Sequence, residues 1–276
     1  MPRIAANLTL LFNELPFLER PAAAAAAGFQ GVECLFPYDG PATELRAALD
    51  QAGLPLVLFN LPPGDWRAGE RGLAGLPGRE AEFRDGLDQA LAYAEALDCP
   101  RLHCMAGIPG ADLAPHRALD TLIANLDHAA GRCAAHDRVL TLEPINSRLD
   151  MPGYLIDTPG RARAVIEALN HPAVRLQYDL YHARVMGEEL FASLAEYLPL
   201  IEHVQFADHP GRHQPGTGDL PLAALLEHLD TLGYSGWASA EYLPSAAGAG
   251  ADGTGWLANL RRRTGSLTDH QEGEVD

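Results

Sequence analysis

Short extended runs alternate with helical patterns eight times along this chain of 276 residues. The extended runs are apolar, and the segments between them carry apolar residues at helical spacing. Gly28, Gly53 and Gly233 follow three of the helical segments, at the position where a left-handed residue commonly ends a helix. Eight strand-then-helix units in one chain of this length predict a single (β/α)8 barrel of the α/β class, with a doubly wound sheet as the weaker alternative.

The expected elements follow from these runs. Strands are expected at residues 4–9, 31–35, 56–60, 101–105, 139–143, 174–179, 201–206 and 237–241. Helices are expected at residues 18–27, 42–52, 79–97, 116–136, 159–169, 188–197 and 221–232. The barrel is expected to form one domain over residues 1–263 and to be followed by a disordered acidic tail at 264–276. An Ala- and Gly-rich link at 245–255 is expected to be mobile, with one short helix between it and the tail.

The net charge of -17 limits the partners of the chain. Its long-range field repels a polyanion, so a nucleic acid held through its phosphates is not expected. The same field repels a small anionic substrate. Such a substrate would need a basic side chain or a metal ion at its binding site.

Targeting signals and cysteine spacing predict the compartment. No apolar stretch approaches the length of a membrane span, and residues 1–7 lack the features of a signal peptide. The cysteines, at 34, 99, 104 and 133, show no paired spacing typical of zinc or of a redox motif. These features predict a reduced, cytoplasmic protein without a membrane partner. A homo-oligomer is plausible, although no interface signature is visible.

Four of the expected strands end on a residue that can bind a divalent metal. These residues are Glu143, Asp179, Gln205 and Glu241. The C-terminal ends of parallel barrel strands meet at one mouth, where three carboxylates and one amide oxygen would form an oxygen-rich site for a hard cation. For any single one of them, an exposed or ion-paired surface residue is the ordinary alternative. The recurrence on four strands predicts a metal-assisted enzyme.

Other candidates lie on the loops at the same face. Arg212 follows the seventh strand and Arg71 lies in the long loop at 61–78, so either could bind a substrate carboxylate, or simply be a surface arginine. That loop is a candidate lid or substrate wall, with Glu70 and Trp66 as further candidates. His103 ends the fourth strand and Glu33 the second; for both, a structural role is equally plausible.

A set of short motifs resembles one family of enzymes. They include Ala6-Asn7-Leu8, Phe36-Pro37-Tyr38, Asn60-Leu61-Pro62, Gly64-Asp65-Trp66, Glu70-Arg71-Gly72, Glu143-Pro144-Ile145-Asn146, Gln177-Tyr178-Asp179, Tyr181-His182, Pro215-Gly216-Thr217-Gly218 and Glu241-Tyr242. Together they span residues from about 5 to about 243. The chain is similar to the hydroxypyruvate isomerases and 2-oxo-tetronate isomerases, within the xylose-isomerase-like TIM barrels that also contain the ketose 3-epimerases.

The resemblance implies roles for particular residues. Glu143 and Glu241 match the two glutamates that give and accept the proton, and they match metal ligands together with Asp179 and Gln205. The epimerases carry histidine where this chain has Gln205, which favours oxygen-preferring Mg2+ or Mn2+. The family also implies that His182 donates to a substrate oxygen, although a role in orienting a ligand or a plain loop position remains open.

The resemblance further implies a reaction. Hydroxypyruvate and tartronate semialdehyde differ in the position of the carbonyl, so a proton leaves one carbon and returns to its neighbour through an enediolate. The alternatives are a 2-oxo-tetronate isomerase and a ketose 3-epimerase of the same barrel family. A nuclease of the endonuclease IV type would need more histidine ligands and a basic face. A non-catalytic barrel would be expected to lack at least one of the four strand-end residues.

Overall fold

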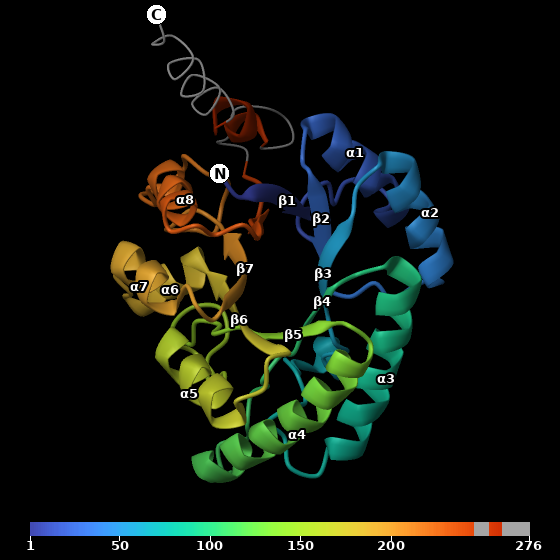
Figure 1. Cartoon of the computed structure of the whole chain (residues 1–276), viewed down its shortest axis with the longest axis vertical. Helices are drawn as coiled ribbons and strands as arrows, with labels where there is room; N and C mark the ends of the chain where they lie inside the picture. The colour runs from blue at the N-terminus through green and yellow to red at the C-terminus, as the bar shows by residue number, and fades with distance from the viewer. Residues whose placement is uncertain (246–253, 261–276) are drawn as a thin grey trace, which may run out of the picture.

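The computed structural model describes residues 1–245 and 254–260 and shows a closed barrel of eight parallel strands in sequence order (Figure 1). β1 pairs with both β2 and β8, and this pairing closes the sheet. The predicted (β/α)8 barrel is confirmed. The strands are β1 (Arg3–Asn7), β2 (Gly31–Cys34), β3 (Leu56–Asn60), β4 (Arg101–His103), β5 (Val139–Leu142), β6 (Val174–Asp179), β7 (Ile201–Phe206) and β8 (Trp237–Ala240).

Helices surround the strands (Figure 1). They are α1 (Arg20–Ala27), α2 (Ala42–Ala52), α3 (Glu80–Leu97), α4 (Pro115–Ala135), α5 (Pro159–Leu169), α6 (Leu180–Met186), α7 (Leu190–Tyr197) and α8 (Leu222–Thr231), with short 3-10 turns η1 (Phe17–Glu19) and η2 (Trp66–Ala68). Their apolar faces pack on the outward-facing strand side chains and form one continuous core, in which Leu87 of α3 and Leu122 of α4 are fully buried. Most of the core therefore lies between sheet and helices, and a separate small apolar cluster is formed by the strand residues Ala5, Val57, Leu58 and Trp237.

Helix α6 is an element that the sequence pattern does not predict. It starts directly after β6 with no intervening loop, and Asp179 is its N-cap. One Asp179 oxygen, Oδ1, accepts from the backbone N–H groups of Tyr181 at 2.6 Å and His182 at 3.1 Å. Capping orients the Asp179 carboxylate and leaves its other oxygen free. The sequence predicts the strand at 174–179 but not the helix that follows it, because a helix of seven residues is too short to show a clear period.

The long loop after β3 is firmly packed in its second half. Leu73 and Ala74 are buried, and the Gly75 N–H donates to the Ala106 carbonyl at 2.8 Å. Gly72 has a φ of +105°, and a Cβ at that position would lie 2.3 Å from the Met105 carbonyl oxygen. Only glycine fits such an approach of two backbones. These contacts favour a fixed wall over a moving lid.

The last described residues, 254–260, include a short helix at 255–260, as expected. The Trp256 ring packs edge-on against Phe29 and Phe206, with ring centroids 6.2 Å and 5.5 Å apart. Most of the expected link, the domain boundary at 263 and the tail at 264–276 lie outside the described residues. Every helix in the described ranges is too short or too polar to cross a membrane. The cytoplasmic location and the homo-oligomer remain predictions.

Candidate active site

The four strand-end residues come together at the C-terminal mouth of the barrel. Glu143 and Glu241 directly follow β5 and β8, Asp179 ends β6 and Gln205 is the penultimate residue of β7. None of the four is more than 5% exposed. Asp179 and Gln205 are direct partners across β6 and β7. Gln177 links two of the four, because its Nε2 donates to Glu143 Oε2 at 3.2 Å and to Gln205 Oε1 at 2.6 Å. The structure thus confirms the convergence that the strand ends predict.

Two histidines face the same carboxylates. His182 Nε2 lies 3.7 Å from Glu143 Oε1 and 3.9 Å from Asp179 Oδ2. His103 Nε2 lies 3.6 Å from Glu143 Oε2, while its Nδ1 contacts Asn60 Oδ1 at 3.2 Å. These separations from the carboxylates are longer than hydrogen bonds. The side chains therefore surround a shared space rather than bonding directly to one another.

Several buried polar atoms around this space lack a hydrogen-bond partner among the described residues. They are Glu143 Oε1, Asp179 Oδ2, His103 Nε2 and Arg212 Nε. Buried polar atoms in proteins are nearly always satisfied, so atoms that converge without partners indicate a ligand. Two free carboxylate oxygens fit a hard divalent cation. The residues present therefore fit the metal that the fold family implies.

The Gln205 side chain makes hydrogen bonds at both ends of its amide. Oε1 accepts from Gln177, and Nε2 donates to Glu33 Oε1 at 2.7 Å. An amide oxygen has two lone pairs, so Oε1 can accept one hydrogen bond and still bind a cation. Its role as a ligand stays a prediction.

The carboxylates raise one another's proton affinity. Burial raises the pKa of Glu143 well above its ordinary value, and the negative charges of Glu241 and Asp179 raise it further. Burial raises the pKa of Glu241 to about 8 and that of Asp179 to about 6, although the positive charge of Arg212 opposes both shifts. A cation bound here would take the place of protons. Carboxyl groups in this range suit proton transfer near neutrality.

Arg212 supplies the positive charge of the site. Its Nη1 lies 3.2 Å from Asp150 Oδ1 and its Nη2 lies 3.4 Å from Glu241 Oε2. The guanidinium lies over the Tyr181 ring, 5.5 Å from the centroid. The backbone of Arg212 has a φ of +57°, in the left-handed region that few side chains adopt. Such a conformation beside reactive groups indicates a functional constraint.

Comparison with known proteins agrees with this geometry. The model of the xylose isomerase-like TIM barrel family matches residues 21–260. The chain belongs to this family. Within it, the 2-oxo-tetronate isomerase of Cupriavidus necator is 47% identical over 257 residues, which cover 93% of this chain and 98% of that protein. The hydroxypyruvate isomerase of Escherichia coli (strain K12) is 41% identical, over 88% of this chain and 94% of that protein.

Two solved structures show the same barrel. A crystal structure described as an AP endonuclease, family 2, from Brucella melitensis is 46% identical, with a TM-score of 0.90 over 94% of this chain and 99% of that one. A 3-keto-D-glucoside 4-epimerase from E. coli has a TM-score of 0.78 at 22% identity, over 95% of this chain and all of that one, and shares the fold alone. The resemblance to the hydroxypyruvate and 2-oxo-tetronate isomerases is confirmed, and the chain is an isomerase of the xylose isomerase-like barrels.

The candidates on the long loop of this isomerase contact one another and neighbouring residues instead of the strand-end carboxylates. Glu70 pairs with Arg79 at 2.6 Å, and Arg71 stacks 3.8 Å from the Trp66 ring centroid while donating to the Trp66 and Glu70 carbonyls. Trp66 in turn packs against Phe36. Among the described residues, Glu70, Arg71 and Trp66 make no hydrogen bond or ion pair with the strand-end carboxylates. Their contacts stabilise the loop, and their role in substrate binding stays a prediction.

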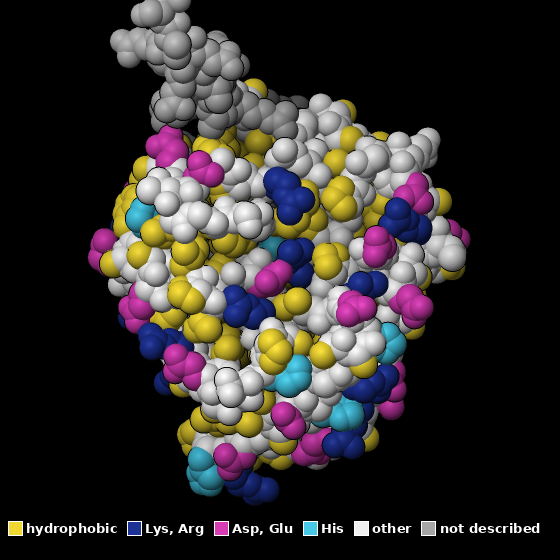
Figure 2. Space-filling model, viewed as in Figure 1, with side chains coloured by type: hydrophobic (Ala, Val, Ile, Leu, Met, Phe, Trp, Pro, Cys, Tyr) yellow, Lys and Arg dark blue, Asp and Glu magenta, His cyan; other side chains and the backbone are white. Residues whose placement is uncertain are grey.

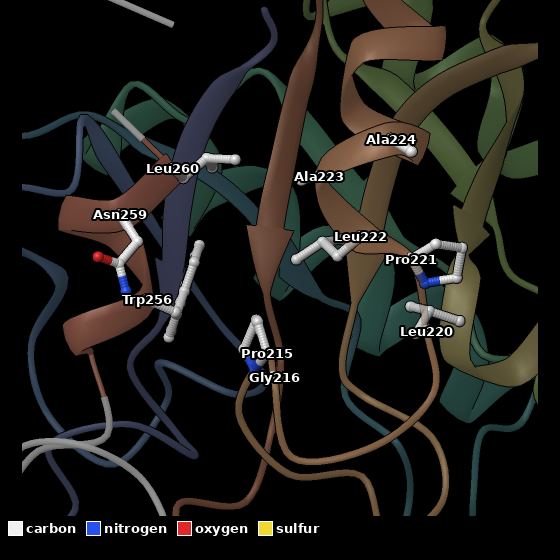
Figure 3. A pocket seen from close by; sticks show the side chains of 10 residues that line it. All are labelled: Pro215, Gly216, Leu220, Pro221, Leu222, Ala223, Ala224, Trp256, Asn259 and Leu260. Atoms are coloured by element: carbon white, nitrogen blue, oxygen red, sulfur yellow. The ribbon is translucent and has the colours of Figure 1, made fainter. Parts of the chain in front are cut away.

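A hollow of about 410 Å³ lies on the outside of the barrel and is lined by none of the strand-end residues. Figure 3 shows its lining, formed by the start of α8, the loop before it and the helical residues 255–260. No lining residue carries a charge or a titratable side chain. This hollow offers nothing that could move a proton or bind a cation.

Beneath the mouth lies a buried polar layer that the sequence analysis missed. It consists of the residue two positions before each strand-end residue, namely Thr141, Gln177, His203 and Ser239. Side chains two apart on a strand share a face, so these polar residues at i−2 could have been found from the sequence. Glu33 joins this layer instead of facing the mouth: it is fully buried and contacts His203 Nε2 at 2.7 Å.

The buried layer holds a negative charge under the carboxylates. Burial alone would raise the pKa of Glu33, but the hydrogen bonds with His203 and Gln205 lower it below its ordinary value. Asn7 also donates to Glu33, at 3.0 Å. The charge of Glu33 contributes to the raised pKa of both Glu143 and Glu241.

Proposed function

We propose that this isomerase interconverts hydroxypyruvate and tartronate semialdehyde, with Glu143 and Glu241 moving the proton. The observation that carries the proposal is a pair of buried glutamates with raised pKa, on strands that are not neighbours, beside one buried arginine. An aldose-ketose interconversion needs a base for the C3 proton and an acid that returns a proton to C2. Two carboxyl groups that approach the substrate from different strands can share these tasks.

In the proposed proton transfer, one glutamate acts as the base and the other as the acid. In the forward direction one carboxylate takes a proton from C3 of hydroxypyruvate, the other carboxyl group gives a proton to C2, and the proton of the C3 hydroxyl passes to the C2 oxygen. The pKa of Glu241, about 8, allows it to hold or release a proton near neutral pH. Burial lowers the pKa of His182 well below its ordinary value, which favours the neutral ring and a role as a hydrogen-bond partner.

We further propose Glu143, Asp179, Gln205 and Glu241 as ligands of Mg2+ or Mn2+. Oxygen donors favour these hard cations over softer metals. When bound, the cation would polarise the two substrate oxygens and stabilise negative charge on them. The unpartnered oxygens of Glu143 and Asp179 support this assignment.

Arg212 is the proposed contact for the substrate carboxylate. It is the arginine that lies against the strand-end carboxylates, and its Nε has no partner among the described residues. A bidentate contact with a carboxylate would use such a free N–H. Arg71 is a weaker candidate because its guanidinium already donates to two carbonyls of its own loop.

A 2-oxo-tetronate isomerase is the second candidate, because the C. necator relative with that name is 47% identical. The two substrates differ by one hydroxymethylene group, worth about 1–3 kcal/mol in a pocket. A ketose 3-epimerase is less well supported, since the solved 3-epimerase structures share under 25% identity and show the fold alone. An endonuclease activity, as in the name of the Brucella protein, fits poorly with the net charge of -17. On the face shown in Figure 2, basic side chains are scattered among acidic ones.

Proton NMR in D2O tests the proposed reaction. The purified protein with Mg2+ or Mn2+ is expected to introduce deuterium at C3 of hydroxypyruvate while tartronate semialdehyde forms. Glu143→Gln, Glu241→Gln and chelation should each abolish both signals. C3 protons that persist with every metal would reject hydroxypyruvate, and 2-oxo-tetronate and free ketoses would then be the substrates to test.

A further inference from the structure

Asn146 lies three residues after Glu143 and is completely buried. Its Oδ1 accepts from the backbone N–H groups of Leu149 at 2.9 Å and Asp150 at 3.0 Å. Its Nδ2 donates to Asp150 Oδ2 and contacts Nδ1 of His182 at 2.7 Å. All four hydrogen-bonding positions of the amide are therefore occupied.

These partners determine which way the Asn146 amide points. Backbone N–H groups only donate, so the atom that faces Leu149 and Asp150 must be the oxygen. The reversed amide would turn its NH2 group toward two N–H donors and its oxygen toward the Asp150 carboxylate. Each buried N–H left without an acceptor costs about 1–3 kcal/mol. The contacts with Leu149, Asp150 and His182 together therefore distinguish the amide oxygen of Asn146 from its nitrogen.

The orientation of Asn146 in turn determines where His182 carries its proton. Nδ1 of His182 faces an N–H donor at 2.7 Å, so it must accept and cannot bear a hydrogen. A neutral imidazole then carries its proton on Nε2, and an imidazolium, with hydrogens on both nitrogens, does not fit. Nε2 is the atom that faces Glu143 and Asp179. The site is therefore presented with an N–H group.

We propose that Asn146 is a positioning residue that holds His182 as the Nε2–H tautomer, which makes His182 a hydrogen-bond donor to a substrate oxygen and excludes it from the metal ligands. Glu143, Asp179 and His182 place ligand-type atoms within 4.8 Å of one another, a grouping that by distance alone would suit a metal. A nitrogen that carries a proton has no lone pair to share with a cation. The substrate contact rests on the proposed function, whereas the tautomer does not.

Asp150 connects this arrangement to Arg212. Its Oδ2 accepts from Asn146, and its Oδ1 contacts Arg212 Nη1 at 3.2 Å. One carboxylate therefore holds both the amide that orients His182 and the guanidinium proposed for the substrate carboxylate. Residues that orient such groups through hydrogen bonds typically affect metal affinity or activity by about 10–100-fold.

Nitrogen NMR of the histidine rings tests the tautomer without substrate or metal. The protein is labelled with 15N-histidine, and two-bond proton-nitrogen correlations distinguish Nε2–H, Nδ1–H and imidazolium rings. The chain has 11 histidines, so the His182 signals are assigned by their loss in His182→Gln. An Nε2–H ring at neutral pH is expected. An Nδ1–H or imidazolium ring in the wild type would overturn the proposal, whatever the protein does to hydroxypyruvate.

The variant Asn146→Asp tests whether Asn146 sets the tautomer. A carboxylate keeps oxygen toward the backbone N–H groups of Leu149 and Asp150 but offers His182 only an acceptor, so the ring proton should move to Nδ1. The variant is made together with Asp150→Asn, because otherwise its new oxygen would face the Asp150 carboxylate. The Nε2 lone pair would then face the site, and binding of Ni2+ relative to Mn2+ should strengthen about tenfold or more in calorimetry. The kcat of the metal-loaded enzyme should fall about 100-fold through loss of one donor.

Asn125→Asp is the matched control. Asn125 is also buried, but it lies on α4 and donates to the Ala74 carbonyl at 2.8 Å, away from His182. It should change neither the His182 ring nor the preference for Mn2+. If Asn146→Asp does not fold, Asn146→Ala removes the donor and should yield a mixture of the two neutral tautomers. A His182 ring that stays Nε2–H in the folded Asn146 variant would show that Asn146 does not set it.

Discussion

Arg212 and Glu241 lie side by side at the barrel mouth, with Nη2 and Oε2 3.4 Å apart. Burial raises the pKa of this carboxyl group to about 8, and the positive charge of the arginine opposes that rise. The arginine also offers positive charge to an anionic substrate in a chain with a net charge of -17. Arg212 therefore has two proposed effects: it lowers the pKa of the proposed base, and it binds the carboxylate of the substrate.

Replacing Arg212 by methionine should affect binding and the pH profile together. We expect kcat/KM for hydroxypyruvate to fall about 10–100-fold, since a hydrogen bond to a charged group contributes about 1.5–3 kcal/mol. Loss of the positive charge should raise the pKa of Glu241 further, which moves the acidic limb of the kcat/KM profile to higher pH. Steady-state kinetics across neutral pH measure both effects. Arg46→Met is the control and should alter neither, because Arg46 lies on the outer helix α2 and pairs with Asp50.

Glu33 and His203 form a buried pair whose disruption should destabilise the barrel. Both side chains are fully buried, and their polar atoms lie 2.7 Å apart. Glu33→Gln is expected to lower the free energy of unfolding by about 3 kcal/mol or more, as measured by urea denaturation, because Asn7, His203 and Gln205 lose a shared carboxylate partner in a fully buried site. Glu202→Gln, which breaks the more exposed pair with Arg101, should cost about 1 kcal/mol or less. Equal losses in the two variants would contradict this view of the buried layer.

Substitutions at two glycines of the long loop should distinguish the cost of backbone strain from the cost of a steric clash. Gly69 and Gly72 both have positive φ, but a Cβ at Gly69 meets nothing within 4 Å, whereas one at Gly72 would lie 2.3 Å from the Met105 carbonyl oxygen. Gly69→Ala should cost about 1 kcal/mol through its φ alone. Gly72→Ala should cost about 1–3 kcal/mol more because Met105 must move. Urea denaturation measures the difference, and similar costs would mean that the loop is not held against Met105.

The metal-free protein should lose stability as pH rises through neutrality. Folded Glu241 keeps its proton up to about pH 8, whereas in the unfolded chain it loses it near about pH 4.3. Between these values the folded state binds more protons, so the free energy of unfolding falls with rising pH. Unfolding in urea with EDTA at several pH values in this window should give a steeper fall for the wild type than for Glu241→Gln, which has no proton to lose. Parallel slopes would argue against a raised pKa.

Much of the fold was predictable from the sequence because strand and helix periods are local. The eight units and the four strand-end residues follow from short runs whose alternation and length depend on nearby residues. The buried polar layer was also predictable, because its residues lie two positions before the strand-end residues and side chains two apart on a strand share a face. Helix α6 was missed because a helix of seven residues directly after a strand shows too little period.

The candidates on loops were less predictable, since a residue type does not show which way a loop side chain points. Arg71 and Arg212 were equal candidates by sequence. The structure places the first against Trp66 and the second against Glu241. The difference arises from the backbone path of each loop, including the positive φ of Arg212.

The sequence by itself therefore determined the barrel and the identity of the strand-end residues, because both depend on patterns within a few residues. Only the tertiary structure decided which distant side chains meet. Glu33 and His203 are 170 positions apart, and Asn146 and His182 are 36 apart. Closing the sheet between β1 and β8 brings such residues together in one buried interior. In that interior bulk water is not available, so each buried polar group needs a hydrogen-bond partner from the protein, and the fold determines which residue that is.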